Sequence, residues 1–465
     1  MVERNRSCIR SEAIVVKPKP CASELSSRIR SCKARIGIVG LGYVGLPLAI
    51  VFSEKYEVWG YEADAEKRLL LRRGISYIDD VSNQSLKARL RGKLHIASST
   101  SMFRRCDCII ICVPTPLDQS GNPDLSYIAS SARIVKRIVR KGMLVVLEST
   151  SYPGTTEEFL GRAIADAGFS PGKDVALAFS PERVDPGNKE FGISSTPKVV
   201  GGINEESTEL AAQLYSSIVE AGVVRVRDCA TAEAVKILEN IFRGVNIALI
   251  NEIALIFDRM GLNTWEIVKA AATKPFGFMA HYPGPGVGGH CIPLDPFYLS
   301  YKAKQYGIVP RFIELGREVN EYMKCHTVNL TVSALRGANL DPQSATVAVI
   351  GLSYKKNTSD TRESPAVSII EELSKRVGKV VVHDQRVASL ATLRGTYRSI
   401  PWNRVLEVAD CLVFLVDHDE FLHLEPKELH GNHVRAIVDA RNLLDKEKVL
   451  NEGLVYRAIG KNSCA

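Results

Sequence analysis

Three glycines directly after a short apolar segment constrain the fold of this chain more than any other feature. Apart from Arg35, residues 35–39 are apolar, and the residues that follow them are Gly40-Leu41-Gly42-Tyr43-Val44-Gly45. In a strand-to-helix turn, the first glycine permits a tight turn, the second lets the backbone approach a pyrophosphate, and the third lets helix and strand pack closely. The pattern predicts a dinucleotide-binding βαβ unit.

A carboxylate follows at the position where it can select the dinucleotide. Glu62 ends the second apolar segment, twenty residues after Gly42. It can accept hydrogen bonds from ribose hydroxyls and would repel a 2′-phosphate. We therefore expect NAD rather than NADP. The alternative interpretation is a glycine turn in an α/β domain that binds no nucleotide.

Apolar segments of strand length alternate with helical stretches over residues 35–226 and again after residue 341. This alternation predicts βα units on parallel sheets. Between the two regions the spacing of apolar residues predicts one long helix over 231–260 and further helices over 263–272 and 309–335. The predicted fold class is α/β, with two doubly wound Rossmann-like domains joined by a central domain built on the long helix. The candidate strands are RIGIV, EVWGYE, CIIICV, MLVVLES, VALAFS, KVVGG and GVVRV, then TVAVIGL, KVVVHD, CLVFLVD and AIVDA.

Composition excludes several classes of protein. The chain has 465 residues, 45% of them hydrophobic and 24% charged, which is typical of soluble proteins with two or three domains. The net charge of +8 is concentrated in residues 1–34, so the body of the chain is too weakly basic to indicate nucleic acid. We expect no membrane span. Eleven scattered cysteines without a C-x-x-C pair or a secretory segment predict a cytoplasmic protein without a metal site.

One cysteine lies in a loop that suits catalysis. The loop contains two adjacent glycines followed by His290 and Cys291, and Asp295 lies four residues further on. Paired glycines let backbone N–H groups converge on a small volume, and a thiolate is a strong nucleophile. The alternative is a structural cysteine, which is what we expect of Cys106 and Cys112.

Two polar residues of the long helix share a face because they are four residues apart. These residues, Lys236 and Asn240, alternate with apolar positions on a helix that we expect to be buried on most sides. A solvent-exposed face is the alternative. A buried polar group needs a partner or a ligand, so this face is a candidate part of the site.

From residue 35 to the C-terminus the chain resembles the nucleotide-sugar 6-dehydrogenases, the family that includes UDP-glucose and UDP-N-acetylhexosamine dehydrogenases. SPERVDPGN and KPFGFMAHYPGPGVGGHCIP look most similar to the branch that oxidises UDP-N-acetylglucosamine. The motifs that carry the resemblance are GIVGLGYVGLPLA (37–49), VPTPLD (113–118), ESTSYPGTTEE (148–158), SPERVDPGN (180–188), AEAVKILEN (232–240), YPGPGVGGHCIPLDPFY (282–298) and GLSYKKNTSDTRESPA (351–366).

The resemblance implies a role for each matching residue. Cys291 would be the nucleophile, Lys236, Asn240 and Asp295 would surround the C6 oxygen of the sugar and the attacking water, and Glu182 would be an acid/base. UDP-glucose members carry a second glutamate where this chain has Pro186, so the carboxylate that activates the hydrolytic water stays open. Besides the glycine loop and Glu62, the residues implied to line NAD are Val113, Pro114, Thr115, Ser149, Thr150 and Arg362. Those implied to hold the UDP-sugar are Tyr282, Gly284, Gly286, Gly288, Tyr354 and Lys355, with Lys274 near a subunit interface.

The implied activity is a four-electron oxidation of the C6 hydroxyl to a uronic acid, through a thiohemiacetal and a thioester on the cysteine, for surface polysaccharide synthesis. UDP-N-acetylglucosamine is the expected substrate; UDP-N-acetylmannosamine, UDP-N-acetylgalactosamine and UDP-glucose are the alternatives. More remote alternatives are a two-electron hydroxyacid dehydrogenase of the 6-phosphogluconate type and a regulator that binds both nucleotides without turnover.

We expect four segments and a homo-oligomer. The segments are a disordered basic extension (1–34), an NAD-binding domain (35–228), a central helical domain with the cysteine loop (229–335) and a UDP-sugar-binding domain (336–465). A long helix that is apolar on several faces must bury them, which predicts a dimer, or a multiple of dimers, through residues 231–260.

Overall fold

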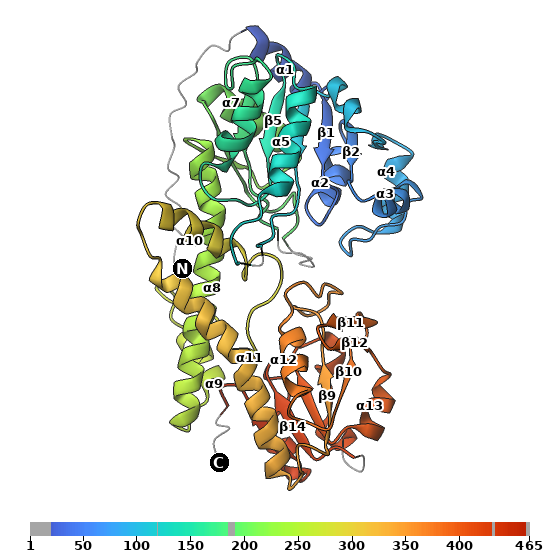
Figure 1. Cartoon of the computed structure of the whole chain (residues 1–465), viewed down its shortest axis with the longest axis vertical. Coiled ribbons are helices and arrows are strands. Elements are labelled where there is room, and N and C mark those ends of the chain that lie inside the picture. Colours follow the sequence, from blue (N-terminus) through green and yellow to red (C-terminus); the bar gives the residue numbers. More distant parts are fainter. Residues whose placement is uncertain (1–19, 119, 185–190, 430–432, 462–465) are drawn as a thin grey trace, which may run out of the picture.

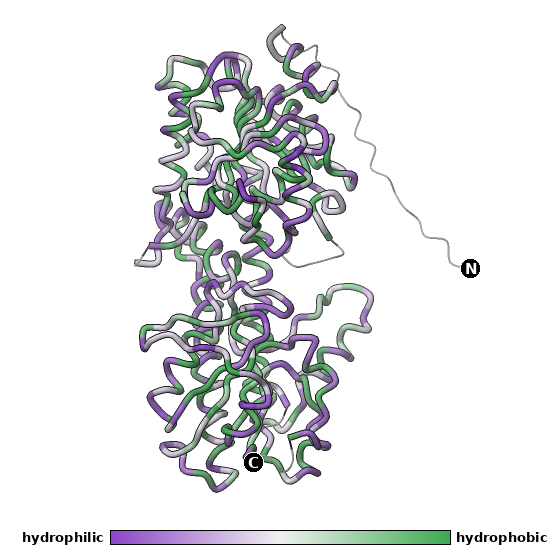
Figure 2. The backbone as a smooth tube through the Cα atoms, turned by 90° about the vertical axis from the view of Figure 1, so that its right-hand side faces the viewer, coloured by the Kyte–Doolittle hydropathy of each residue, from purple (hydrophilic) through white to green (hydrophobic). Residues whose placement is uncertain are grey.

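The computed structural model describes residues 20–118, 120–184, 191–429 and 433–461. An upper and a lower α/β lobe are joined by a column of two long helices, α8 and α11 (Figures 1 and 2). The prediction of two doubly wound domains around a helical centre is confirmed. The helices of the column are α8 (Cys229–Arg259) and α11 (Arg311–Gly337), and two shorter helices, α9 (Thr264–Ala271) and α10 (Asp295–Gln305), lie beside them.

The upper lobe is built on one eight-stranded sheet with the order β3-β2-β1-β4-β5-β6-β7-β8. The central strands are buried on both faces, which explains why they read as continuous apolar runs. The strands are β1 (Arg35–Val39), β2 (Glu57–Tyr61), β3 (Leu94–Ile96), β4 (Cys108–Ile111), β5 (Leu144–Leu147), β6 (Ala176–Phe179), β7 (Lys198–Gly202) and β8 (Val223–Val226). The helices are α2 (Gly45–Phe52), α3 (Ala65–Arg72), α4 (Asn83–Leu90), α5 (Ser126–Ile138), α6 (Arg162–Asp166) and α7 (Glu205–Ser216), with short η1 (Thr100–Arg105) and η2 (Thr156–Gly161).

The expectation of a fully parallel sheet is wrong for the last two strands, β7 and β8, which are parallel to each other. β7 runs antiparallel to β6, with Ala178 opposite Gly202 and Phe179 opposite Gly201. A parallel connection needs a crossover, usually a helix, and the described residues between these strands, 180–184 and 191–197, contain none. The three-residue strand β3 was also missed, because it is too short to show a pattern.

The predicted disordered extension is wrong for residues Pro20–Arg30, which form helix α1. Leu25 and Ile29, four residues apart, are buried against the upper core, and α1 packs on α7. The Ser26 hydroxyl donates to Gln213 Oε1 at 2.7 Å, and Arg28 pairs with Asp107 at 2.9 Å. Packing on this apolar surface of the lobe stabilises the segment as a helix. Residues 1–19 lie outside the described part of the chain.

The lower lobe has a parallel five-stranded sheet with the order β10-β9-β13-β14-β15. The strands are β9 (Thr346–Ile350), β10 (Lys379–His383), β13 (Cys411–Phe414), β14 (Ala436–Asp439) and β15 (Val455–Ala458), and a separate hairpin pairs β11 (Ser389–Thr392) with β12 (Gly395–Arg398). Its helices are α12 (Pro365–Leu373), α13 (Trp402–Val408) and α14 (Lys446–Asn451), with short η3 (Asp419–Phe421) and η4 (Pro426–Glu428). The sequence did not reveal β15 or the hairpin.

Helix α8 is long and apolar enough to cross a membrane, judged by length and composition alone. One of its faces packs against α10 and α11 inside the molecule. The other face exposes large apolar side chains: Leu238 (66% exposed), Phe242, Leu249, Ile256 and Met260 (62%). We name this set the α8 apolar face.

Candidate active site

The turn between β1 and α2 has the geometry that a dinucleotide pyrophosphate requires. Gly40 adopts a φ of 89°, and a Cβ there would lie 2.5 Å from the carbonyl oxygen of Cys112. A Cβ on Gly45 would lie 1.9 Å from the carbonyl oxygen of Gly40. A Cβ on Gly42 would meet no heavy atom within 4 Å, so the backbone there is open to an anion. With the N-terminus of α2 beside it, the turn fits the pyrophosphate of NAD.

Glu62 follows β2 and closes the same turn. Its carboxylate accepts hydrogen bonds from the backbone N–H groups of Leu41 and Asp64, each at 3.1 Å. Carboxylate oxygens have further lone pairs, so the group can still accept from a ribose hydroxyl. The geometry agrees with the role that we predict for Glu62.

The other segments implied to line NAD lie at the carboxyl ends of β4 and β5. The Ser149 hydroxyl donates to the carbonyl oxygen of Val113 at 2.8 Å, which ties the two segments together. Thr115 is buried, and the Tyr298 hydroxyl of α10 donates to the carbonyl oxygen of Pro116 at 3.3 Å. Open α/β sheets bind ligands at this edge. Residues 113–115 and 149–150 therefore occupy the expected place for a cofactor.

Four of the predicted catalytic residues form one cluster where α8 meets the start of α10. Lys236 and Asn240 are buried on the same face of α8. Asn240 Nδ2 donates to Asp295 Oδ2 at 2.5 Å, and the backbone N–H of Asp295 donates to the carbonyl oxygen of Cys291 at 2.9 Å. Asp295 Oδ1 is buried and has no hydrogen-bond partner within the described ranges.

Burial dominates the proton affinities in this cluster. It raises the pKa of the Cys291 thiol to about 11; Asp295 adds to this rise, and Lys236 opposes it. Burial also raises the pKa of Asp295 to about 7, while Lys236 and the hydrogen bond from Asn240 oppose it. Asp295 therefore titrates near neutrality, as a group that exchanges protons during turnover should. Lys236 is the cation that both groups face.

Buried amides hold the glycine-rich loop, residues 282–289. Asn251 Oδ1 of α8 accepts from the backbone N–H of Gly284 at 2.9 Å, and its Nδ2 donates to Asn320 Oδ1 of α11 at 2.9 Å. The ring of Tyr282 stacks on Trp265 at 5.1 Å between centroids. Both long helices therefore set the position of the loop implied to hold the UDP-sugar.

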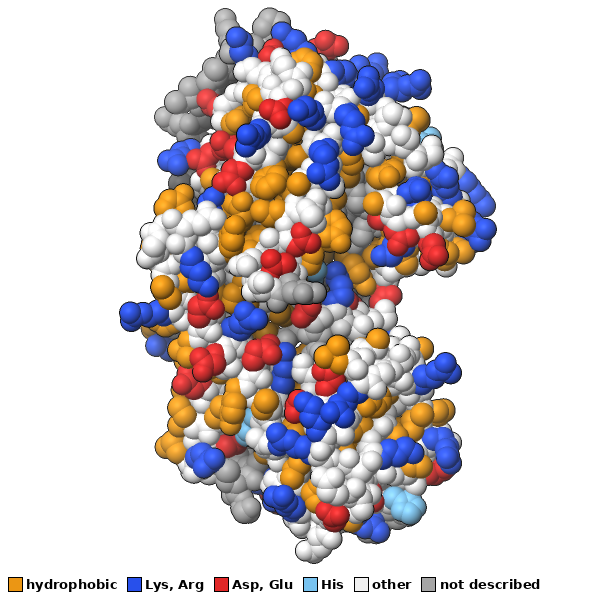
Figure 3. All heavy atoms as spheres, viewed as in Figure 1, with side chains coloured by type: hydrophobic (Ala, Val, Ile, Leu, Met, Phe, Trp, Pro, Cys, Tyr) orange, Lys and Arg blue, Asp and Glu red, His pale blue; other side chains and the backbone are white. Residues whose placement is uncertain are grey.

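The lower lobe contributes two of the predicted residues to the same region. Tyr354 packs on the loop so closely that a Cβ on Gly288 would lie 2.7 Å from Tyr354 Cβ. The Arg362 guanidinium pairs with Asp360 at 2.6 Å and lies 4.0 Å from the ring centroid of Tyr43 in the upper lobe. Arg362 therefore bridges the two lobes beside the dinucleotide turn. The molecular face is hollowed where the lobes meet (Figure 3).

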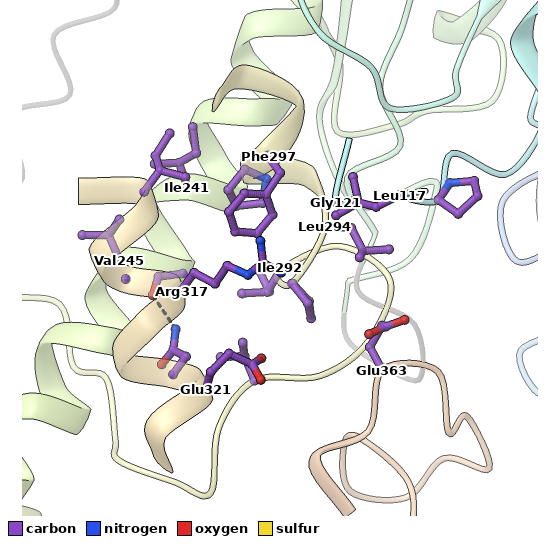
Figure 4. Close-up of a pocket in the computed structure, with 18 of the residues that line it drawn as sticks. Leu117, Gly121, Ile241, Val245, Ile292, Leu294, Phe297, Arg317, Glu321 and Glu363 are labelled. Atoms are coloured by element: carbon purple, nitrogen blue, oxygen red, sulfur yellow. Dashed lines mark hydrogen bonds between the residues drawn. The ribbon is translucent and has the colours of Figure 1, made fainter. Parts of the chain in front are cut away.

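A pocket of about 300 Å³ lies beside the cysteine loop, between the upper lobe, α8, α10 and α11 (Figure 4). Arg317 crosses it with its guanidinium 4.6 Å from the ring centroid of Phe297, and Glu321 and Glu363 lie at its rim. A Cβ on Gly286, which has a φ of 114°, would lie 3.0 Å from the carbonyl oxygen of Asn320 in the pocket wall. The apolar lining is Leu117, Ile241, Val245, Val287, Ile292, Leu294, Phe297 and Ile313.

Three predicted residues lie outside the cluster. Glu182 follows β6 and pairs with Lys198. Lys274 is exposed, 5.0 Å from the ring centroid of Phe276. Lys355 lies in the loop after β9, where its carbonyl accepts from the Ser353 hydroxyl at 2.8 Å. Pro186 lies outside the described residues.

Sequence reasoning missed several residues beside the site. Glu233 accepts hydrogen bonds from the N–H groups of Gly154 and Thr156, at 2.6 and 2.8 Å, and anchors α8 on the upper lobe one turn before Lys236. Arg441 follows β14 and lies against Gly284, because a Cβ on Gly284 would be 2.8 Å from Arg441 Nη1. Lys198 and Glu148 form a buried ion pair at 3.0 Å. The only signal in the sequence for this ion pair is a lysine at the start of an apolar strand.

Family models identify all three parts of the chain. Residues 34–219 match the NAD binding domain of the UDP-glucose/GDP-mannose dehydrogenase family, residues 230–322 its central domain, and residues 348–446 its UDP binding domain. The chain belongs to this family. The resemblance seen in the sequence is therefore confirmed. Because the upper lobe matches the NAD binding domain of this family, NAD is the cofactor.

Individual relatives cover nearly the whole chain. The UDP-N-acetyl-D-mannosamine dehydrogenase of Pyrococcus horikoshii is 37% identical over 92% of this chain and 99% of its own. The UDP-N-acetyl-D-glucosamine 6-dehydrogenase of Pseudomonas aeruginosa is 36% identical over 89% of this chain and 98% of its own. A solved structure of the P. horikoshii UDP-D-ManNAc dehydrogenase superposes with a TM-score of 0.85, covering 92% of this chain and all of that one. The predicted NAD-dependent nucleotide-sugar 6-dehydrogenase, of the UDP-N-acetylhexosamine type, is confirmed.

Discrimination against NADP is a testable consequence of the Glu62 geometry. We expect the native enzyme to use NADP poorly, because the 2′-phosphate would meet this carboxylate. Glu62→Gln should lower KM for NADP by about tenfold or more, while Glu66→Gln, at an exposed carboxylate on α3, should change nothing. Initial rates with each dinucleotide measure this. Native rates with NADP within a few-fold of those with NAD would refute the assignment.

Proposed function

We propose that this enzyme oxidises the C6 hydroxyl of UDP-N-acetylglucosamine to the carboxylate. The observation that carries the proposal is the buried cluster of Lys236, Asn240, Cys291 and Asp295, one thiol with a cation and a carboxylate beside it. The similarity of two loop motifs to the UDP-N-acetylglucosamine branch supports this sugar, as does the P. aeruginosa relative named for it. The P. horikoshii relative makes UDP-N-acetylmannosamine the second candidate.

The first oxidation converts the C6 alcohol to an aldehyde. NAD, when bound, accepts one hydride and therefore two electrons in each of two rounds. Lys236 stabilises the alkoxide that develops as the hydroxyl loses its proton, and Asp295, with a free buried oxygen, is placed to take that proton. Asn240 keeps the carboxylate in position through its 2.5 Å hydrogen bond.

The second oxidation proceeds on the enzyme. Cys291 sulfur adds to the aldehyde carbon while the thiol proton passes to the aldehyde oxygen, which gives a thiohemiacetal and keeps the reactive aldehyde bound. Loss of the second hydride, which NAD would accept when bound, together with loss of the hydroxyl proton gives a thioester. Water then adds to its carbonyl carbon, the C–S bond breaks, and the uronic acid leaves with the thiol restored.

We propose that the UDP group lies between the glycine-rich loop and the lower lobe. Tyr282 and Gly284 lie on the loop, Tyr354 and Lys355 follow β9, and Arg441 follows β14. The carboxyl ends of these parallel strands form the usual ligand edge of such a sheet. Arg441 Nε is fixed on the carbonyl of Leu415 at 2.9 Å, and its guanidinium reaches the loop at Gly284. Its charge suits a diphosphate.

The decisive experiment counts NADH released per sugar with a panel of UDP-sugars. We expect two NADH per UDP-N-acetylglucosamine and slower turnover of UDP-N-acetylmannosamine, UDP-N-acetylgalactosamine and UDP-glucose. Faster turnover of another hexosamine would replace the sugar and keep the chemistry. One NADH per sugar would leave the two-electron alternative, and binding without turnover would leave the regulator.

The product, a UDP-linked uronic acid, suits surface polysaccharide synthesis in the cytoplasm. The described cysteines are free thiols, in agreement with a reducing compartment: Cys32, Cys106, Cys108, Cys112, Cys229, Cys291, Cys325 and Cys411.

We also propose that two copies associate through the α8 apolar face, because its large apolar side chains are exposed to solvent in the single chain. Leu249→Glu should convert the native dimer to monomer, because it places a charge in the interface. Leu393→Glu, at a 95% exposed leucine of the hairpin in the lower lobe, is the control and should stay dimeric. Sedimentation at micromolar concentration measures both. A native protein that is monomeric and fully active would contradict the proposal, and with it the expected place of Lys274 at a subunit interface.

A further inference from the structure

A buried charge network connects three strand ends of the upper sheet at the cofactor edge. Lys198 Nζ lies 3.0 Å from Glu148 Oε2 and 3.2 Å from Glu182 Oε2. The side chains of Lys198 and Glu148 are 4% and 0% exposed, whereas that of Glu182 is 14% exposed. Of the three side chains, that of Glu182 is therefore the most exposed.

The direction of β7 creates this network. In the antiparallel β6–β7 register, Phe179 lies opposite Gly201. Continuing that register three residues past the ladder places Glu182 opposite Lys198. Lys198 is the first residue of β7, so it lies at the same edge as the carboxyl ends of β5 and β6. Glu148 directly follows β5 and immediately precedes Ser149 and Thr150, which are implied to line NAD.

Each charge in the network has a second partner. Glu182 Oε1 accepts the N–H groups of Arg183 and Val184, at 2.6 and 2.8 Å. Glu148 Oε1 accepts from the Tyr215 hydroxyl of α7. Lys198 Nζ also lies 5.2 Å from the ring centroid of Tyr215. Every carboxylate oxygen therefore has a donor, and the side chains cannot rotate without losing one.

We infer that Lys198, held by Glu148 and Tyr215, is the positioning residue that keeps Glu182 ionised and fixed at the cofactor edge of the sheet as the acceptor of the proton from the hydrolytic water. This inference rests on the proposed function, because it concerns the thioester step. In that step the water O–H proton passes to the Glu182 carboxylate, the water oxygen bonds to the thioester carbon, and the C–S bond breaks. The thiolate of Cys291 that leaves takes up this proton, which returns Glu182 to its ionised form.

The electrostatic surroundings favour an ionised Glu182. Although burial raises its pKa, Lys198 and the two backbone N–H groups outweigh burial and hold that pKa below its usual value. Burial and the negative charge of Glu182 raise the pKa of Glu148, which Lys198 opposes. The other groups that face the network are the hydroxyl of Tyr215, the thiol of Cys112 and the Arg183–Glu239 ion pair, which closes at 2.6 Å.

Two substitutions on opposite sides of the network should shift one pH profile in opposite directions. Removing the cation in Lys198→Met raises the pKa of Glu182, so the acid limb of thioester hydrolysis should move to higher pH by about 1 to 3 units. Glu148→Gln keeps the shape of the side chain but removes its negative charge. Lys198 then forms an ion pair with Glu182 only. Its acid limb should therefore move to lower pH.

The measurement uses the full-length enzyme in rapid-mixing experiments over a pH series. NADH formed in the burst reports the two oxidations, and the steady rate reports hydrolysis. We expect a full burst in both variants. Only the acid limb in the pH profile of the steady rate should shift. Lys198→Arg should restore the native limb. Lys136→Met, which breaks the exposed Lys136–Asp166 pair of the same lobe, should match the native enzyme.

The inference is overturned if both variants still give a burst but their acid limbs stay at the native pH or move in the same direction. The network would then be a structural ion pair only. If Lys198→Met fails to fold, Glu148→Gln decides alone: a shift to lower pH supports the inference, and any other result overturns it. Failure of the proposed function is distinguishable, because the native enzyme would then show no two-NADH burst with any UDP-sugar.

Discussion

Cys291→Ser is expected to lower the rate of acid formation by roughly 10³- to 10⁶-fold while NAD and UDP-sugar binding persist. The serine hydroxyl is far less acidic than the thiol and forms its adduct slowly without a dedicated base. Cys291→Ala should have the same effect. Counting NADH in single turnovers and measuring binding by calorimetry separate the lost chemistry from lost affinity.

A second cysteine provides the matched control. Cys325 on α11 is exposed and free, so Cys325→Ser should retain the native rate. Alkylation should show the same contrast: iodoacetamide should inactivate the native enzyme, faster as the pH rises toward the pKa of Cys291 at about 11, and UDP-sugar should protect. Two NADH per sugar at near-native rate from Cys291→Ala would contradict the thioester route.

Lys236→Met is expected to cost about 10²- to 10³-fold in turnover, the usual loss when one group that stabilises a developing oxyanion is removed. The pH dependence should change as well. Lys236 lowers the pKa of Asp295 from the higher value that burial alone would impose. Its loss should raise that pKa above about 7, so the rate that depends on ionised Asp295 should be lost at higher pH than in the native enzyme.

A lysine of α9 provides the matched control for Lys236. Lys269→Met removes an exposed lysine from α9 in the same central domain and should leave both the rate and the pH profile unchanged. Native turnover in Lys236→Met would remove this lysine from the chemistry. An unchanged pH profile with lowered turnover would show that Asp295 does not supply the observed ionisation.

Local patterns in the sequence predicted much of the fold and the central part of the site. The glycine turn after residues 35–39, the apolar strands and the long helix each carry a pattern in nearby residues, because the turn needs glycines and buried elements place apolar residues at characteristic spacings. The four-residue spacing of Lys236 and Asn240 likewise placed both on one helix face. The cysteine loop carried its signal in consecutive residues, and the structure brings Cys291 and Asp295 to that face.

Contacts between distant residues decided the rest. Helix α1 forms because α7 offers Leu25 and Ile29 an apolar surface, which the basic composition of residues 1–34 hides. The direction of β7 follows from a connection without a crossover helix in its described residues, and it alone brings Lys198 to Glu182. The apolar pattern of a strand does not reveal whether the strand runs parallel or antiparallel to its neighbour. The sequence therefore determined which residues form the strand, and only the tertiary structure determined which charges meet at its end.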